Sequence, residues 1–381
     1  MKRRPKVLID TFHLLNALTG IRTYTTELCA GLEKLDDPAV EYITSPNWRK
    51  LNQSRFLRGR VGPLKKILNH LLYFGWKQLV LPWIILFRRI DVVVAPDYML
   101  PLVRFGAKGV PVFHDTFYWE LKKSYNPLWR VYFLFLVKAG LSKKSMIIST
   151  TQYISEKIRQ KVTDRYPIVP IYQCAKSLEA ATDNYDLSQL GLAANDRYFL
   201  HVGVFDTRKN LELLVEAFDQ FLKKADNPEI KLVLAGSPAV TIFHNSYGKV
   251  QQLIKEKGLE EKVLLPGFVP EAGLSALYSQ AFAYVFPSLE EGFGIPVLEA
   301  MNAGLPVVIS DQPALVEVAG GAALVFDRND AEALCQQLIL LEDESLRDSL
   351  IEQGKARAAQ FGQDQFAADF HKTMLSYLES Q

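Results

Sequence analysis

The amino-acid sequence predicts an α/β fold with two doubly wound parallel sheets, one in each of two domains. Short apolar runs alternate with longer helical patterns along all 381 residues. These runs are continuously apolar, as expected for parallel strands that helices cover on both faces. Strand–helix alternation on this scale is typical of α/β proteins. The chain is long enough, and at 49% hydrophobic residues apolar enough, to give each domain its own core.

Ten apolar runs are predicted as buried strands, four in the first half and six in the second. They are residues 7–10, 92–95, 110–114 and 146–149, then 198–202, 231–235, 263–265, 283–285, 307–309 and 323–325. A stretch rich in Ala, Asp, Asn and Ser, 177–196, separates the halves and predicts a domain boundary after residue 185. The last segment, 363–381, has the pattern of an amphipathic helix.

Cysteines and apolar runs indicate a protein that is made and kept in the cytosol. Cys29, Cys174 and Cys335 lie far apart and fit no metal or redox spacing, so we expect reduced, buried thiols. The basic N-terminus leads into an apolar run too short for a signal peptide. The longest apolar runs, 79–87 and 131–137, fall below the roughly 18 residues of a membrane span.

The net charge of +2 hides an asymmetry between the halves. Residues 1–190 hold 29 Lys and Arg against 15 Asp and Glu, whereas the remainder holds 15 against 27. The stretch 42–90 has no acidic residue and ten basic ones, including Arg55, Arg58 and Arg60. This pattern favours an anionic neighbour, and we expect these three arginines at an acceptor or membrane face on the inner side of the cell membrane. A solvated face is the alternative. No nucleic-acid module is recognisable, so nucleic acid is not an expected partner.

The strongest local signal is the run 287–307, which follows a predicted strand. Gly292 and Gly294 permit a tight turn and a close approach of the backbone to a ligand, and a proline suits the helix start behind them. A strand, a glycine turn and a helix start place N–H groups and a positive dipole end where a phosphate can bind. We expect Glu291 and Glu299 to point into the same cleft, where a carboxylate can accept vicinal ribose hydroxyls.

This run resembles the signature of a known enzyme family. Glu291 and Glu299 stand within an E-G-F-G-x-P-x-L-E-A-M frame similar to that of the retaining GT-B glycosyltransferases of the family-4 type, the glycosyl transferases group 1. The resemblance implies that Glu299 binds the donor ribose and Glu291 the transferred sugar. It also implies that the backbone of Gly292, Phe293, Gly294 and Ile295 lies near the sugar and phosphate of the donor.

The resemblance carries expectations for the whole chain. It implies a GT-B fold of two Rossmann-like domains across a cleft, with the acceptor on domain 1–185 and the donor on domain 186–362. The helix 363–381 is expected to cross back onto the first domain. The implied reaction transfers a hexose, mannose or glucose, from a GDP- or UDP-linked sugar to a glycan or lipid-linked acceptor in polysaccharide or glycolipid synthesis. The implied stereochemistry is retention, with no metal or other cofactor.

A second signal lies at 201–211, where V-G-x-x-x-x-R-K-N resembles the first strand–loop–helix of the family's donor domain. In that family a lysine neutralises the departing diphosphate, and Lys209 takes this role here, with Arg208 beside it. Many relatives carry an arginine where this chain has Val204, and whether Arg208 replaces it stays open. Cations are unfavourable at a helix N-terminus, so their presence itself indicates an anion site.

Two further resemblances concern the first domain. A predicted strand ends at His114-Asp115, similar to the family's H-D pair, whose histidine contacts the donor sugar; Asp115 orients His114 or caps the next helix. The order Gly-Ile-Arg-Thr-Tyr resembles a G-I-G-R-Y-T loop, although its second glycine is absent. This assigns Gly20 to the donor site and Arg22 and Tyr24 to the acceptor face; a plain helix N-terminal loop is the alternative.

Two other functions keep the same fold. One is a nucleotide-sugar epimerase or a sugar-phosphate-forming synthase, although epimerases of this fold lack the two-glutamate frame. The other is a non-catalytic membrane-surface protein, which would not need Lys209, Glu291, Glu299 and His114 together. A NAD-dependent enzyme is disfavoured because no G-x-G-x-x-G follows the first strand.

Overall fold

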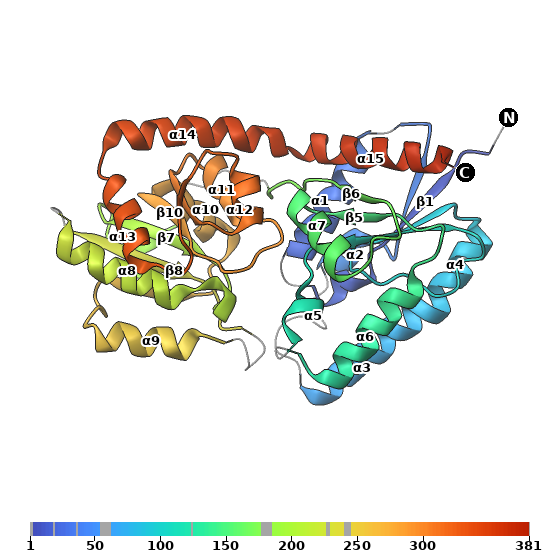
Figure 1. Ribbon diagram of the computed structural model, residues 1–381, viewed down its shortest axis with the longest axis horizontal. Helices are drawn as coiled ribbons and strands as arrows, with labels where there is room; N and C mark the ends of the chain where they lie inside the picture. The colour runs from blue at the N-terminus through green and yellow to red at the C-terminus, as the bar shows by residue number, and fades with distance from the viewer. Residues whose placement is uncertain are drawn as a thin grey trace. The chain divides into compact units, whose positions relative to one another are not determined.

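The chain forms two compact units, seen in the computed structural model of Figure 1. The structure describes residues 3–17, 20–35, 37–53, 62–122, 125–176, 185–225, 229–239 and 245–380. The first unit is Met1–Cys174 with Gly362–Gln381, and the second is Ala175–Phe361. The second unit begins before the predicted boundary at residue 185. Lys176 pairs with Glu271 at 2.5 Å, and Tyr185 packs against Gly273; Glu271 and Gly273 belong to one helix of the second unit.

The first unit is built on one parallel six-stranded sheet in the order β2-β1-β3-β4-β5-β6. Its strands are β1 (Lys6–Asp10), β2 (Glu41–Ser45), β3 (Val92–Ala95), β4 (Lys108–Phe113), β5 (Ile147–Ser149) and β6 (Ile168–Pro170). Its helices are η1 (Phe12–Leu15), α1 (Gly20–Leu35), α2 (Trp48–Gln53), α3 (Pro63–Gly75), the π-helical η2 (Trp76–Val80), α4 (Leu81–Arg88), α5 (Phe117–Glu120), α6 (Pro127–Gly140), α7 (Gln152–Lys161) and α15 (Gln363–Glu379).

Alternate residues of these strands face two helical layers, as the period of two in a strand requires. Val7 and Ile9 of β1 belong to a buried cluster with α1 and α15, whereas Leu8 belongs to another with Leu81 and Ile85 of α4. A third cluster joins α6 and α7 to β5. The strands are therefore apolar on both sides.

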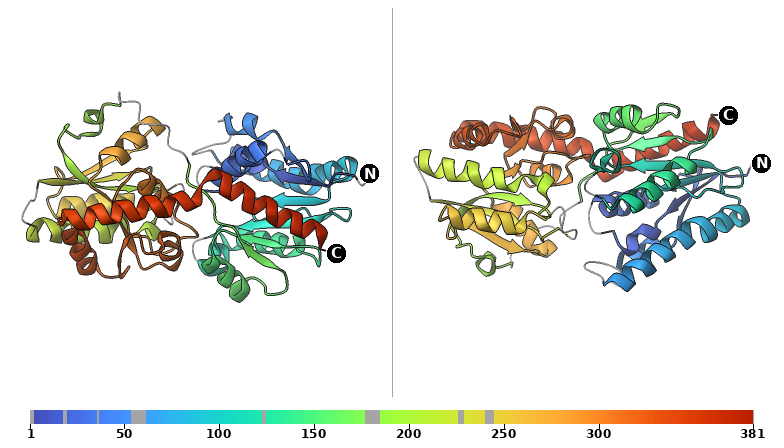
Figure 2. Two further views of the ribbon diagram at one scale, coloured as in Figure 1. Left: turned by 90° about the horizontal axis from the view of Figure 1, so that it is seen from above. Right: turned by 60° about the horizontal axis from the view of Figure 1, so that its bottom comes forward.

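The C-terminal helix α15 completes the core of the first unit, and Figures 1 and 2 show it beside α1. Phe366, Phe370 and Met374 are fully or almost fully buried against β1, β3 and α1. The two helices approach closely, because a Cβ on Gly31 of α1 would lie 2.8 Å from the Cβ of Ala367.

The second unit repeats this architecture, with a parallel sheet in the order β12-β11-β10-β7-β8-β9. Its strands are β7 (Arg197–Val202), β8 (Ile230–Ala235), β9 (Val263–Gly267), β10 (Ala283–Phe286), β11 (Val307–Ser310) and β12 (Leu324–Phe326). Its helices are η4 (Leu187–Leu190), η5 (Thr207–Lys209), α8 (Leu211–Lys224), α9 (Tyr247–Glu256), α10 (Glu271–Gln280), α11 (Ile295–Asn302), α12 (Pro313–Ala319), α13 (Ala331–Leu340), α14 (Glu344–Ala358) and η7 (Ala359–Phe361).

The predicted α/β class with two parallel sheets is confirmed. One expectation needs correction, because the apolar runs were judged too short for a membrane span. The helical rod α3–η2–α4 contains the first of these runs, 79–87, and its stretch Ile67–Arg88 is long and apolar enough by length and composition to cross a membrane, with 22% of its most apolar 18-residue window buried. How this rod is held is described below.

Candidate functional site

The candidate site lies where the strand order of the second unit reverses. From β7 the chain proceeds outward to β8 and β9, then returns to place β10 on the other side of β7. Open parallel sheets bind ligands at the carboxyl ends of the strands that flank such a switch point. The two loops that leave β7 and β10 here carry the residues singled out from the sequence, Lys209 and Glu291.

Two cations converge on one carboxylate oxygen at this point. Lys209 Nζ lies 2.5 Å from Glu291 Oε1, and Arg208 Nη1 donates to the same oxygen at 3.0 Å. Arg208 also donates to the carbonyl oxygen of Glu290 at 3.2 Å. The short helix η5 places both cations, and the side chain of Asp206 caps it by accepting from the N–H of Arg208. Ion pairs thus connect the loop after β7 to the loop after β10.

Burial and charge shift the pKa values of this cluster. Burial lowers the pKa of Lys209, as does the neighbouring Arg208, while Glu291 opposes both. Burial alone would raise the pKa of Glu291, but Lys209 and Arg208 hold it below its ordinary value. His201, buried beneath the loop, has a pKa lowered to about 3 by burial and by Lys209. Its Nδ1–H donates to the carbonyl oxygen of Val285 at 3.0 Å, which fixes the tautomer of the neutral ring.

The glycine turn before α11 has the conformation that its sequence predicts. Gly294 has φ +104, which strains any other residue, and a Cβ there would lie 2.6 Å from Leu315 Cδ2. Gln312 Nε2 donates to the backbone oxygen of Glu291 at 3.0 Å, and this hydrogen bond fixes the loop that precedes α11. The side chain of Phe293 is buried, and Ile295 begins the helix.

The second glutamate, Glu299, has a different environment. It is partly buried on α11 and accepts a hydrogen bond from the hydroxyl of Tyr278 at 3.2 Å. Burial raises the pKa of Glu299 to about 7, with the Tyr278 hydrogen bond acting in the opposite direction. Both glutamates contribute to raising the pKa of Tyr284, after the larger effect of its burial, so Tyr284 is close to both carboxylates. Glu291 is paired with cations, whereas among the described residues no cation lies within ion-pair distance of Glu299.

In the first unit His114 follows β4 directly. Its Nε2–H donates to the carbonyl oxygen of Pro96 at 2.7 Å. Burial lowers the pKa of His114 to about 4, so the ring is neutral near pH 7. The rings of Tyr24 and Tyr98 meet it edge-on, with centroids 4.9 and 5.9 Å away. Asp115 accepts from the N–H of Phe117 at 3.0 Å, just before α5, whose N-cap residue is Thr116.

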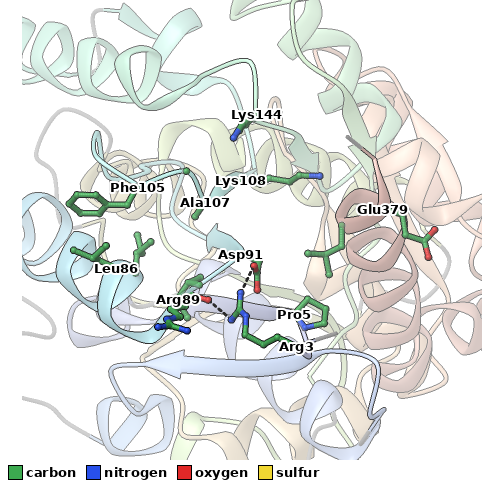
Figure 3. A pocket seen from close by; sticks show the side chains of 14 residues that line it. Arg3, Pro5, Leu86, Arg89, Asp91, Phe105, Ala107, Lys108, Lys144 and Glu379 are labelled. Atoms are coloured by element: carbon green, nitrogen blue, oxygen red, sulfur yellow. Dashed lines mark hydrogen bonds and ion pairs between the residues drawn. The ribbon is translucent and has the colours of Figure 1, made fainter. Parts of the chain in front are cut away.

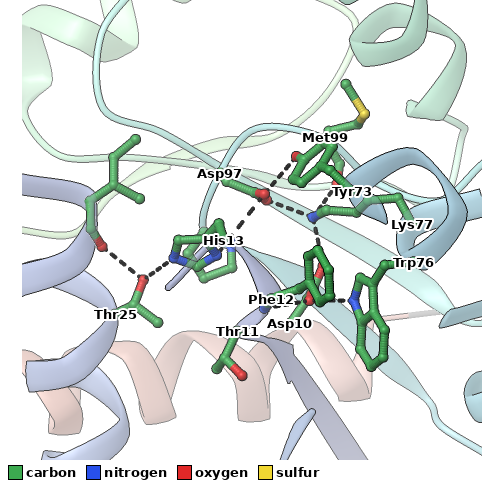
Figure 4. Close-up of polar contacts among 12 residues, drawn as sticks. Asp10, Thr11, Phe12, His13, Thr25, Tyr73, Trp76, Lys77, Asp97 and Met99 are labelled. Carbon is green, nitrogen blue, oxygen red and sulfur yellow. Dashed lines mark hydrogen bonds and ion pairs between the residues drawn. The ribbon is translucent and has the colours of Figure 1, made fainter. Parts of the chain in front are cut away.

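A buried charge network that sequence reasoning missed fills the equivalent switch point of the first unit, between β1 and β3 (Figure 4). Lys77 of η2 is completely buried and lies 2.6 Å from both Asp10 and Asp97. Tyr73 donates to Asp97 at 2.6 Å, and Trp76 donates to Asp10 at 2.9 Å. The available signal for this network was Lys77, the one Asp, Glu, Lys or Arg in the apolar run 67–87.

One residue assigned to the acceptor or membrane face, Tyr24, needs correction. Tyr24 is completely buried in the core of the first unit beside Phe366, so it cannot offer a surface contact. Arg22 is half-buried on α1 and donates to Asn52 of α2 at 2.8 and 2.9 Å. Gly20 begins α1. Arg55, Arg58 and Arg60 lie outside the described residues. Within the described parts of the chain, no group of three or more His, Cys, Asp and Glu side chains is placed to hold a metal ion.

Comparison with known proteins agrees with this geometry. Residues 185–357, which contain Lys209, Glu291 and Glu299, match the family model of the glycosyl transferases group 1. The chain matches this model over just under half of its length. Its fold is GT-B, since the whole chain superimposes on a sucrose-phosphate synthase from Thermosynechococcus elongatus with a TM-score of 0.72, covering 99% of this chain and 100% of that one at 20% identity.

The chain has relatives that are named as mannosyltransferases. It is 37% identical over 166 residues to the O-antigen chain mannosyltransferase B of Escherichia coli, which covers 43% of this chain and 42% of that protein. It is 27% identical over 267 residues to the O-antigen chain mannosyltransferase RfbU of Salmonella typhimurium, covering 69% and 67%. The match to the first of these relatives thus spans less than half of its length.

Proposed function

We propose that the chain is a retaining hexosyltransferase, which moves a hexose from a nucleoside-diphosphate sugar to a glycan or lipid-linked acceptor. The observation that carries the proposal is the convergence of Lys209 and Arg208 on Glu291 at the switch point of the donor domain. Mannose is the first candidate sugar, because two relatives are named as O-antigen mannosyltransferases. Synthesis of a cell-surface polysaccharide at the cytoplasmic side is the matching process.

The proposed chemistry follows from charge. When the bond between sugar and diphosphate breaks, negative charge grows on the leaving oxygen and needs a preorganised cation. Lys209 and Arg208 supply two cations from a rigid helical turn, and Asp206 fixes that turn. Glu291 holds them in position before the donor binds and then accepts hydrogen bonds from hydroxyls of the sugar. No further cofactor enters this proposal.

Glu299 is proposed as the ribose contact. A carboxylate can accept hydrogen bonds from two vicinal hydroxyls at once. Since Tyr278 is the hydrogen-bond donor that Glu299 meets in the structure, the carboxylate retains accepting capacity for a ligand. The neutral His114, in the first unit, is proposed to contact the donor sugar without attracting the diphosphate as a cation would.

A thermal-shift screen with GDP, UDP, ADP and CMP tests the donor site. A ligand at about 100 times its dissociation constant adds about 2.7 kcal/mol of stability, so binding of one diphosphate is easily seen. Glu299→Ala should abolish the shift. Turnover is then measured with the matching mannose and glucose donors. Release of the diphosphate only when a glycan or lipid-linked acceptor is present identifies a transferase. Release of the diphosphate without acceptor, or conversion of the donor to its epimer, identifies one of the alternatives. If no nucleotide binds, the proposal is contradicted.

A further inference from the structure

Large apolar side chains are exposed unevenly between the two units. Among the described residues, nineteen large hydrophobic side chains of the first unit are exposed, against four of the second. All but one of the nineteen lie on three neighbouring parts: the rod α3–η2–α4, the loop 102–105, and α6. We call these eighteen side chains the apolar face. They are Leu64, Ile67, Leu68, Leu71, Leu72, Phe74, Leu79, Val80, Trp83, Leu86, Phe87, Leu102, Val103, Phe105, Leu128, Val131, Tyr132 and Phe135.

The parts of this face are neighbours in space. Figure 1 and the right-hand view of Figure 2 show α3 continuing into α4, with α6 alongside α3. His70 of α3 contacts Trp129 of α6 with ring centroids 4.3 Å apart, and Trp83 of α4 lies 6.3 Å from Phe105 in the loop. Phe87 is 77% exposed and Leu128 84%. Soluble proteins rarely expose a continuous apolar surface of this extent without a partner for it.

Contacts with the sheet fix the rod along one side, so the apolar face stays on the outside. Lys77 at its centre is buried in ion pairs with Asp10 and Asp97, which end or follow strands of the sheet. Leu81 and Ile85 pack against Leu8 of β1 and Val93 of β3. The rod is therefore fixed along one side, and its other side presents apolar residues outward, as in a helix that lies in the plane of a membrane interface.

A basic hollow adjoins the end of α4 (Figure 3). It has a volume of about 940 Å³, and its walls carry four cations against two carboxylates. Those side chains are Arg3, Arg89, Lys108 and Lys144 with Asp91 and Glu379. Leu86 and Phe105 of the apolar face line it as well. The hollow lies at the amino ends of β1, β3 and β4, the opposite edge of the sheet from His114, so it is separate from the candidate site.

The charges of the hollow leave room for an anion. Arg3 is neutralised by Asp91 at 2.6 Å, and Lys108 donates to the backbone oxygen of Tyr377 at 2.5 Å. Burial lowers the pKa of Lys108, and the nearby Lys144 lowers it further. An anion placed between these lysines would relieve their repulsion.

The charge around the apolar face selects its occupant. Residues 42–90, 98–114 and 121–155, which include every part of the face, contain no Asp or Glu. Exposed cations border it, among them Lys65, Arg88, Lys138 and Lys143. Two copies of such a face would repel each other, whereas an anionic lipid surface attracts it at about 1 kcal/mol for each cation near the surface.

We propose that the apolar face inserts into the interface of an anionic lipid bilayer, and that the basic hollow binds the phosphate of a lipid head group. The first unit then lies on the membrane through α3, η2, α4, the loop 102–105 and α6. This surface is built from described residues only, and it does not depend on the proposed transfer reaction.

Co-sedimentation of the purified full chain with vesicles tests the apolar face. Vesicles of phosphatidylcholine alone are compared with vesicles that also contain phosphatidylglycerol, at low and high salt. We expect binding to the anionic vesicles that weakens with salt. Trp83→Glu combined with Phe87→Glu should lower the bound fraction at least tenfold. Phe268→Glu, at a 79% exposed position of the second unit, is the matched control and should bind like the wild type. Absence of binding at low salt overturns the proposal.

A second pair of variants tests the basic hollow. Arg89→Glu with Lys144→Glu should abolish the preference for anionic over neutral vesicles, whereas Lys249→Glu with Lys255→Glu on α9 should not. A preserved preference in the first pair overturns the role of the hollow. Sedimentation velocity checks the rival occupant: a dimer that Phe87→Glu dissociates, without vesicle binding, assigns the face to a second copy. Nucleotide thermal shifts should be unchanged in these variants, so this test and the test of the transfer reaction can fail separately.

Discussion

Lys209 Nζ lies 2.5 Å from Glu291 Oε1, and both side chains are buried. The cation expected to meet the diphosphate thus already has an anionic partner from the neighbouring loop. A bound donor must redistribute this charge, because its phosphates and the carboxylate seek the same cations. The ion pair therefore orders the empty site, and binding of the donor must change it.

Glu291→Gln should destabilise the empty protein. Removing this partner leaves the buried Lys209 without the carboxylate that pairs with it, which lowers the free energy of unfolding by about 3–5 kcal/mol. Urea unfolding measures the change, and a nucleoside diphosphate should restore part of it by supplying negative charge. Glu260→Gln, at an exposed position, is the control. Equal stability of Glu291→Gln and wild type would show that the ion pair is not needed for folding.

Lys209→Met should preserve the fold and remove most of the turnover. Methionine replaces the buried stem, but it supplies no charge to the leaving diphosphate, and loss of one such group lowers kcat by about a hundredfold or more. Steady-state kinetics with the donor that the nucleotide screen identifies measures the effect, with circular dichroism to verify the fold. Lys249→Met on the exposed side of α9 is the matched control. Full activity in Lys209→Met would remove the lysine from the mechanism.

Glu299→Gln should stabilise the protein at pH 8 and leave it almost unchanged at pH 5. Folding raises the pKa of Glu299 from 4.5 to about 7. A carboxyl with a raised pKa binds its proton more tightly in the folded state, so stability falls as pH rises between these values. Thermal melting of both proteins at pH 5 and pH 8 tests this difference. A melting-temperature gap that does not depend on pH would contradict the raised pKa.

The same substitution should weaken nucleotide binding, since the ribose loses a charged acceptor. Wild-type affinity for the diphosphate should rise from pH 6 to pH 8 as Glu299 ionises, whereas the affinity of Glu299→Gln should not. Calorimetry at both pH values gives the comparison. Parallel pH dependences in the two proteins would assign the effect to another group.

His114 should remain neutral throughout the physiological range. Its pKa is lowered to about 4 by burial, and its Nε2–H is held by the carbonyl of Pro96. In nitrogen-detected NMR of histidine-labelled protein, the His114 ring should show no titration between pH 5.5 and pH 8. A midpoint near pH 6.5 would mean that the ring is accessible to water in solution.

Gly236→Ala should strongly destabilise the second unit. Its Cβ would lie 1.7 Å from the backbone oxygen of Gly203, in the loop that leads from β7 to Lys209, so this loop must move. We expect a loss of more than about 3 kcal/mol in the free energy of unfolding, as for other severe steric changes. Gly248→Ala, in open space on α9, should instead be neutral or stabilising by up to about 1 kcal/mol.

Much of the fold could be predicted because the central strands are buried on both faces. β1, β3, β7 and β10 are continuous apolar runs, and each was expected within a residue or two of its observed bounds. The edge strands β2 (Glu41–Ser45) and β6 (Ile168–Pro170) were missed, since their residues are only half-buried and their sequences are correspondingly mixed. Exposure on one side erases the apolar run that identifies a strand.

The candidate site was predictable only in part. The glycine turn around Gly294 and the proximity of Lys209 to the strand end follow from local sequence. The network of Lys77 with Asp10 and Asp97 brings together residues from three distant segments, and no local pattern announces such a pairing. Tyr24 was assigned to a surface because of its place in a motif, whereas helix α1 turns it into the core.

Helix α15, the last element of the chain, has a consequence for how the protein is made. A ribosome delivers the six strands of the first unit long before it delivers Phe366, Phe370 and Met374, which fill one side of that sheet. The second unit, by contrast, is one uninterrupted segment that can close as soon as it emerges. The order of maturation is therefore the reverse of the order of synthesis: the part that is translated first is the last to complete its core, and a chain that stops short of Gln363 leaves an apolar groove along α1 open to chaperones and proteases.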